Sequence, residues 1–125
     1  MHTTGIHLLL EYWGCDVGVL DDLVGIKEAM TEAARATRAR IVGSIFEPFV
    51  PQGVTGVVVI EESHLSIHTW PEKGYAAVDS YTCGQCDPRR AHEVLVKRLR
   101  AKRHAMMRIR RGLTEAPYLE VLPPD

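Results

Sequence analysis

Hydrophobic and polar residues follow a clear pattern in the middle of the chain, and the pattern predicts two consecutive strands. Residues 57–60 are continuously apolar, which is typical of a buried strand, and we extend this strand to residues 54–60. Over residues 64–70 the residues alternate, so His64 and His68 should share one face of a strand while Leu65 and Ile67 share the other. Pro71 should end this strand because proline cannot donate to a sheet ladder.

Residues 75–81 read as the returning strand of a hairpin, and they bring a thiol back towards Ser63. Ser63 begins the preceding strand, His68 lies on it, and Cys83 follows the returning strand. We therefore expect Ser63, a histidine (His64 or His68) and the thiol of Cys83 to converge at the end of the hairpin.

The rest of the chain divides into two helices and four further strands. A helix should begin at Asp21 or Asp22, either of which can cap it, and run to about residue 37. A second should span residues 89–103, where the basic run K-R-L-R-A-K-R at 97–103 fits the solvated face of an amphipathic helix. Strands are expected at residues 6–13, 41–46, 105–111 and 118–122, with turns at 14–18 and 84–88 and a loop at 47–53.

This order of elements predicts an α+β fold. We expect a two-layer sandwich with a mostly antiparallel sheet and two helices on one face. Two helices cover only that face, and residues 57–60 suggest that the other face is apolar as well. The sequence therefore predicts a homodimer that forms through the sheet or a sheet edge, with the active sites at its interface.

Composition narrows the class of protein. A chain of 125 residues fits one domain, and 46% hydrophobic with 25% charged residues is ordinary for a globular protein. The net charge of -1 gives no reason to expect nucleic acid or a membrane as partner. The N-terminus lacks a signal-peptide pattern, and three cysteines without a disulfide framework favour the cytoplasm.

Two other chemistries deserve comparison with the hairpin. Cys83-Gly84-Gln85-Cys86 is a C-x-x-C, which could be a redox pair or half of a zinc site completed by Cys15, His7 or His92. A Ser-His-acid hydrolase is disfavoured because no G-x-S-x-G surrounds Ser63.

Several motifs resemble the S-adenosylmethionine decarboxylase proenzymes of bacteria and archaea. They are E-S-H-L-S-I-H-T-W-P-E at 62–72, G-Y-A-A at 74–77, Y-T-C-G at 81–84, G-I-H-L at 5–8, W-G-C-D at 13–16 and P-Q-G-V-T-G-V-V-V-I at 51–60. The likeness covers most of the chain up to about Pro88 and fades after it. The resemblance implies a cytoplasmic, self-processing enzyme that decarboxylates S-adenosylmethionine for spermidine and polyamine biosynthesis.

The resemblance also implies how the chain would process itself. The Ser63 hydroxyl attacks the carbonyl of Glu62 and turns the amide into an ester. Loss of the Ser63 α-proton then eliminates the Glu62 carboxylate, and the resulting dehydroalanine rearranges and loses ammonia to leave a pyruvoyl group. His68 matches the family's processing proton acceptor, and Thr55 stands where the family uses a serine hydroxyl. The single domain 1–125 would be cut into a β chain, 1–62, and an α chain, 63–125.

For catalysis the resemblance implies a covalent, self-made pyruvoyl cofactor at Ser63, with neither a metal nor pyridoxal phosphate. Its carbonyl forms a Schiff base with the substrate amine and withdraws electrons as carbon dioxide leaves. Cys83 matches the proton donor. By position, Phe49 and Trp70 would stack the adenine and Glu72 would bind the ribose.

The chain departs from the family at three positions near the expected site. Glu47 and Pro48 replace a histidine and a basic residue that many relatives carry, and Glu61 replaces a common serine. Added carboxylates would suit a substrate with a terminal cation, so ornithine or arginine is the alternative substrate for the same pyruvoyl chemistry. The sequence leaves open whether putrescine activates the enzyme.

Overall fold

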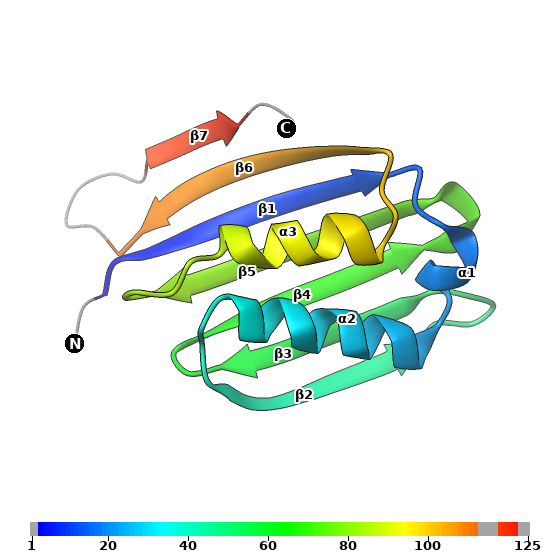
Figure 1. Cartoon of the computed structure of the whole chain (residues 1–125), viewed down its shortest axis with the longest axis horizontal. Helices are drawn as coiled ribbons and strands as arrows, with labels where there is room; N and C mark the ends of the chain where they lie inside the picture. The colour runs from blue at the N-terminus through cyan, green and yellow to red at the C-terminus, as the bar shows by residue number, and fades with distance from the viewer. Residues whose placement is uncertain (1–2, 113–117, 123–125) are drawn as a thin grey trace.

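The computed structural model describes residues 3–112 and, as backbone, 118–122. One seven-stranded sheet has the order β2-β3-β4-β5-β1-β6-β7, and every neighbouring pair is antiparallel (Figure 1). Its strands are β1 (Gly5–Trp13), β2 (Ile41–Pro48), β3 (Val54–Ile60), β4 (Ser63–Trp70), β5 (Tyr75–Cys83), β6 (Arg103–Arg111) and β7 (Tyr118–Leu122).

Two main helices lie on the same face of this sheet, which confirms the predicted two-layer α+β fold (Figure 1). They are α2 (Leu23–Ala36) and α3 (Arg89–Arg98). Asp22 is the cap of α2, because its carboxylate accepts from the amide of Gly25 at 3.1 Å. In the described part of the chain, no helix combines the length and the apolar character needed to cross a membrane.

The core lies between the sheet and the helices, and the predicted strand faces supply it. Leu65 and Ile67 of β4 are fully buried, whereas His68 is exposed on the opposite face. The α2 side of the core consists of Ile26, Ala29, Met30, Ala33 and Ala34. The period of two in the sequence therefore identified correctly which side of β4 is covered.

No helix among the described residues covers the other face of the sheet, which we call the open face (Figure 1). It carries exposed apolar side chains on the strands at one edge, with Ile45 65% and Val59 42% exposed. Toward the middle of the face lie His64, Ser66, His68 and Trp70 of β4 and Tyr75, Asp79, Tyr81 and Cys83 of β5.

The second helix is shorter than predicted. It ends at Arg98, and Arg100 adopts a left-handed conformation with φ of 55°. The amides of Arg100 and Ala101 turn back to the carbonyls of Lys97 and Val96 at 3.1 and 3.2 Å, which closes the helix end with local hydrogen bonds. The basic run is therefore divided between the helix, a turn and the start of β6.

The predicted loop at 47–53 and turn at 14–18 also contain regular structure. Glu47 and Pro48 continue β2, where Pro48 pairs with Val54. A proline is tolerated there because β2 is an edge strand. The turn contains the short helix α1 (Val17–Leu20), and a 3₁₀ turn, η1 (Pro71–Lys73), joins β4 to β5.

We predict that Gly56→Ala destabilises the protein by about 1–3 kcal/mol, because the ring of Phe46 occupies the space that a Cβ would need. Gly43→Ala is the matched control, since it also lies in a strand and nothing lies within 4 Å of its would-be Cβ. Urea denaturation measures both variants. Equal midpoints for the two would contradict the packing argument.

Candidate active site

The turn between β3 and β4 places its second residue under backbone strain. Ile60 pairs with Ser63, so Glu61 and Glu62 form the turn, and Glu62 adopts φ of 68°. A residue with a Cβ adopts this left-handed conformation at a cost of about 1–2 kcal/mol. Arg40 anchors the turn, because its carbonyl accepts from the Glu61 amide at 2.8 Å and its Nε lies 3.0 Å from the Glu61 carboxylate.

A serine and a thiol meet at this turn, as the hairpin predicted. Cys83 ends β5, and its Sγ lies 3.9 Å from the carbonyl oxygen of Glu62. The Ser63 hydroxyl donates to the carbonyl of Tyr81, a strand away. The peptide bond between Glu62 and Ser63 therefore has a nucleophile on one side and a weak hydrogen-bond donor at its carbonyl.

The absence of a side chain at Gly5 leaves space for the side chain of Cys83. Gly5 pairs with Cys83 across the β1–β5 ladder. A Cβ built on Gly5 would lie 3.1 Å from Cys83 Sγ, 2.7 Å from a ring carbon of Tyr81 and 2.8 Å from the Thr82 carbonyl oxygen. Only a residue without a side chain lets β1 lie this close to the thiol.

His68 does not meet Ser63 within one chain, which corrects the expected convergence for His68. Both residues belong to the extended strand β4 and are five positions apart, so about 16 Å separates them along the strand. The partner of His68 is Thr55, which pairs with it across β3 and β4 and whose Oγ1 lies 3.2 Å from Nδ1. The alternation of residues in the sequence predicted which face of β4 carries His68, but it did not predict the distance between His68 and Ser63.

The residues assigned to substrate also lie at the His68 end of the hairpin. Trp70 ends β4, Glu72 lies in η1, and Phe49 follows β2 (Figure 1). Trp70 is 38% exposed and Phe49 51% exposed. Their position matches that of His68 and Thr55, far from Ser63 and Cys83.

Tyr75 supports Trp70 from one side. The two rings stack with centroids 5.3 Å apart, and the Tyr75 hydroxyl donates to Glu11. Burial and the bond to Glu11 raise the pKa of Tyr75 to about 12, so its hydroxyl keeps the proton that it donates. Trp70 therefore has Tyr75 stacked on it, and the His68 ring lies tilted against it with centroids 6.3 Å apart.

The sequence interpretation missed a cluster around Asp79 on the open face. His7, His64 and Ser66 all contact this carboxylate. A signal was present, because Asp79 has the same parity as Cys83 along β5 and so shares its face. The register that aligns β1 with β5 could not be read from the pattern.

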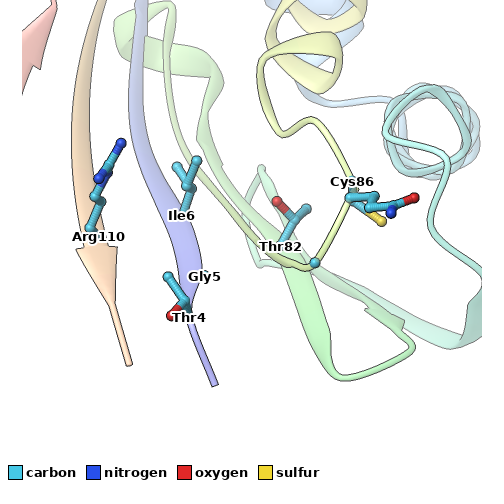
Figure 2. A pocket seen from close by; sticks show the side chains of 8 residues that line it. Thr4, Gly5, Ile6, Thr82, Cys86 and Arg110 are labelled. Carbon is cyan, nitrogen blue, oxygen red and sulfur yellow. The ribbon is translucent and has the colours of Figure 1, made fainter. Parts of the chain in front are cut away.

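Cys86 has surroundings unlike those of Cys83. It lines a cavity of about 520 Å³ together with Ile6, Thr82 and Arg110 (Figure 2). Burial and the neighbouring Cys83 raise the pKa of the Cys86 thiol, whereas redox-active cysteines have a lowered pKa. Among the described residues, the cluster with metal-ligand spacing is His7, His64 and Asp79, which includes neither cysteine. The raised pKa of the Cys86 thiol argues against a redox role, and the metal-ligand spacing found in the described part of the chain does not involve the C-x-x-C.

Solved structures share the fold of this chain. The crystal structure of the adenosylmethionine decarboxylase from Aquifex aeolicus has a TM-score of 0.82 and 38% identity, and the match covers 92% of this chain and 96% of that one. A Trypanosoma brucei AdoMetDC monomer shares the fold alone, with a TM-score of 0.63, 14% identity and 83% and 45% of the two chains covered. The chain therefore has the fold of a decarboxylase.

Sequence relatives identify the family. The profile described as S-adenosylmethionine decarboxylase matches residues 6–112. The S-adenosylmethionine decarboxylase proenzyme of Thermotoga petrophila is 51% identical over 113 residues, covering 90% of this chain and 87% of the relative. That of a Thermoanaerobacter species is 48% identical over 118 residues, covering 94% and 95%. The chain belongs to the S-adenosylmethionine decarboxylase family.

We predict that Gly5→Ala lowers kcat by about tenfold or more, because the new methyl displaces the thiol of Cys83, and small displacements of reacting groups are costly. Release of carbon dioxide from S-adenosylmethionine measures the effect. Gly43→Ala, which adds the same methyl in open space, should retain the wild-type rate. A Gly5→Ala enzyme with wild-type kcat would show that Cys83 is not confined in this way.

Proposed function

We propose that the chain cuts itself between Glu62 and Ser63 and that the pyruvoyl group formed from Ser63 supports its catalysis. The activity is that of the family: an S-adenosylmethionine decarboxylase, a pyruvoyl-dependent carboxy-lyase of polyamine biosynthesis. The observation that carries the proposal of self-cleavage is the strained Glu62, whose carbonyl oxygen faces the thiol of Cys83 and whose carbonyl carbon is bonded to Ser63.

The cleavage begins with a rotation of the Ser63 side chain. Its hydroxyl leaves the carbonyl of Tyr81 and attacks the carbonyl carbon of Glu62, which exchanges the amide for an ester. Left-handed backbone at Glu62 is relieved when this bond breaks. The thiol of Cys83 is placed to donate to the carbonyl oxygen as it gains negative charge.

The second stage removes the Ser63 α-proton and expels the Glu62 carboxylate. A base must take that proton, and His68 is the proposed acceptor because an imidazole can both accept and donate a proton. Thr55, 3.2 Å from His68 Nδ1, would orient the ring. Water then releases ammonia from the dehydroalanine, which leaves fragments 1–62 and 63–125.

A pyruvoyl group supplies an electron-withdrawing carbonyl that stabilises the electron pair left when carbon dioxide departs. Cys83 is the proposed proton donor to the product, since its thiol lies beside the carbonyl of residue 62 at the end of β5. Its contact with that carbonyl gives Cys83 a part in cleavage as well as in turnover.

We propose a homodimer in which the Ser63 end of the hairpin in one copy lies against the His68 end of the hairpin in the other copy. In one chain, Ser63 and Cys83 lie at one end of the sheet, and His68 and Thr55 at the other. A two-fold axis lying between two open faces and perpendicular to the strands reverses the strand direction. It would place the partner subunit's His68 over Ser63, so that each site uses both copies.

The open face supports this dimer. Its exposed apolar side chains, such as Ile45 and Val59, would be removed from water by a second copy. The polar side chains of β4 and β5 would lie inside the interface, where substrate is shielded from bulk solvent. The residues at the His68 end would enter the partner's site together.

The proposed adenosyl site lies at that end. Adenine would stack on the face of Trp70 opposite Tyr75, with Phe49 on its other side and the ribose hydroxyls on Glu72. The Glu61 carboxylate pairs with Arg40 at 3.0 Å, at the Ser63 end of the hairpin. A cationic substrate such as ornithine or arginine would have to compete with Arg40 for this carboxylate.

We predict that wild-type protein runs as two fragments on a denaturing gel, whereas Ser63→Ala and His68→Ala each stay whole. Co-refolding of Ser63→Ala with His68→Ala chains should restore cleavage, because a mixed dimer contains one site with an intact Ser63 and an intact His68. The mass of the fragments shows that the His68→Ala chain was cut. An intact wild-type chain that is active would refute self-cleavage, and a mixture that stays whole would refute the shared site.

We predict that Trp70→Ala raises KM for S-adenosylmethionine by about tenfold or more, because base–aromatic stacking is worth about 1–3 kcal/mol. The effect on kcat should be smaller, since the ring is remote from the reacting bond. Val24→Ala is the control, a 65% exposed apolar residue on α2. A Trp70→Ala enzyme with unchanged KM would remove Trp70 from the substrate site.

A further inference from the structure

The carboxylate of Asp79, on β5, is a shared acceptor for side chains of the two neighbouring strands β1 and β4. The Nε2 atoms of His7 and His64 lie 2.6 and 3.1 Å from its Oδ2, and the Ser66 hydroxyl donates to Oδ1. Burial raises the pKa of Asp79, but the hydrogen bonds from His7, Ser66 and His64 outweigh it and hold the pKa well below its usual range. Asp79 is therefore an anion that accepts from both imidazoles.

Arg111 fixes the tautomer of His7. Its Nη1 lies 3.3 Å from His7 Nδ1, and a guanidinium can only donate. Nδ1 must accept, so the ring proton of His7 sits on Nε2 and points at Asp79. The hydrogen bonds run in one direction, from Arg111 through His7 to the carboxylate.

This direction argues for a positioning cluster rather than a metal site. The donor atoms of His7, His64 and Asp79 lie within 4.8 Å of one another, a spacing that a metal ion could bridge. A metal on His7 Nε2 would leave the ring proton on Nδ1, where it would face the donors of Arg111. Without a metal ion the hydrogen bonds are consistent, because Arg111 donates to His7, and His7, His64 and Ser66 donate to Asp79.

The Asp79 cluster contacts two residues that adjoin Ser63, one in sequence and one through a hydrogen bond. One is His64, which follows Ser63 in sequence, and the other is Tyr81, whose carbonyl accepts from the Ser63 hydroxyl. The rings of Tyr81, His7 and His64 form a triangle, in which the Tyr81 centroid lies 5.0 Å from His7 and 6.1 Å from His64 and the two histidine centroids are 5.8 Å apart. The Arg111 guanidinium covers the ring at 4.6 Å.

We propose that Asp79 is a positioning residue for the group at residue 63, acting through His64. The inference rests on the proposed self-cleavage. Before cleavage, Glu62 and His64 hold residue 63 from both sides. After cleavage the bond to Glu62 is gone, and His64 becomes the first anchored side chain of the new fragment. Loss of the Asp79 carboxylate should therefore disturb turnover more than cleavage.

The test compares Asp79→Asn, His64→Ala and the double variant. The asparagine keeps the volume of the carboxylate and one acceptor oxygen, but it removes the negative charge that strengthens the hydrogen bonds from both imidazoles. Cell-free synthesis followed on a denaturing gel gives the cleavage half-time, and carbon dioxide release from fully cut protein gives kcat and KM. Ser66→Ala is the matched control, because it removes a donor to Asp79 but leaves both imidazole bonds in place.

We expect Asp79→Asn and His64→Ala each to lower kcat by about ten- to a hundredfold, the loss that a displacement of about 1 Å can cause. KM and the cleavage half-time should stay near wild type, and the double variant should be no worse than either single one. Ser66→Ala should retain most of kcat. If Asp79→Asn fails to fold, His64→Ala still tests the proposal, because His64 is the residue through which Asp79 would act. Its side chain is partly exposed, so its truncation should be tolerated by the fold.

Four outcomes would overturn the positioning role. They are an unchanged kcat in Asp79→Asn or in His64→Ala, additive losses in the double variant, slower cleavage with a normal kcat of the cut protein, and one equivalent of zinc on wild type that is lost in His7→Ala. An uncut but active wild type would instead refute self-cleavage itself, so the two failures are distinguishable.

Discussion

The register of β4 between β3 and β5 is the constraint on which the rest of the structure depends. It sets Ser63 opposite Ile60 and close to Tyr81, and it sends Leu65 and Ile67 into the core. A slip of one residue would exchange the two faces, burying imidazoles and exposing the leucine and isoleucine. The same strand register buries Leu65 and Ile67 and places Ser63 beside Tyr81. Burial of the apolar side chains therefore also determines where Ser63 lies.

The same extended strand keeps the parts of the site apart. A strand separates residues that are close in sequence, so Ser63 and His68 lie about 16 Å from each other although four residues intervene. A base can then come close to Ser63 only if another segment of protein passes over Ser63. The open face offers no helix for that purpose in the described residues, which is why the proposed site uses two copies.

Much of this architecture could be predicted from local patterns. Alternation gave the faces of β4, and the hairpin brought Cys83 to Ser63, because both depend on residues close in sequence. The end of α3 was misplaced because a left-handed arginine closes it, where glycine is the usual signal. The contact of His7 with Asp79 joins residues 72 positions apart, and it depends on a register between distant strands that no local pattern encodes.

The position of β1 in the sheet affects how the protein would unfold and refold after cleavage. This strand lies between β5 and β6, while β3 pairs with β4, so segments from before and after residue 62 are interleaved in one sheet. If the backbone is cut there, the two pieces cannot separate without dismantling three ladders. Once they do separate, reassembly becomes a bimolecular reaction that depends on concentration. The mature protein would then owe its fold to the uncut precursor, and unfolding would be harder to reverse after maturation than before it.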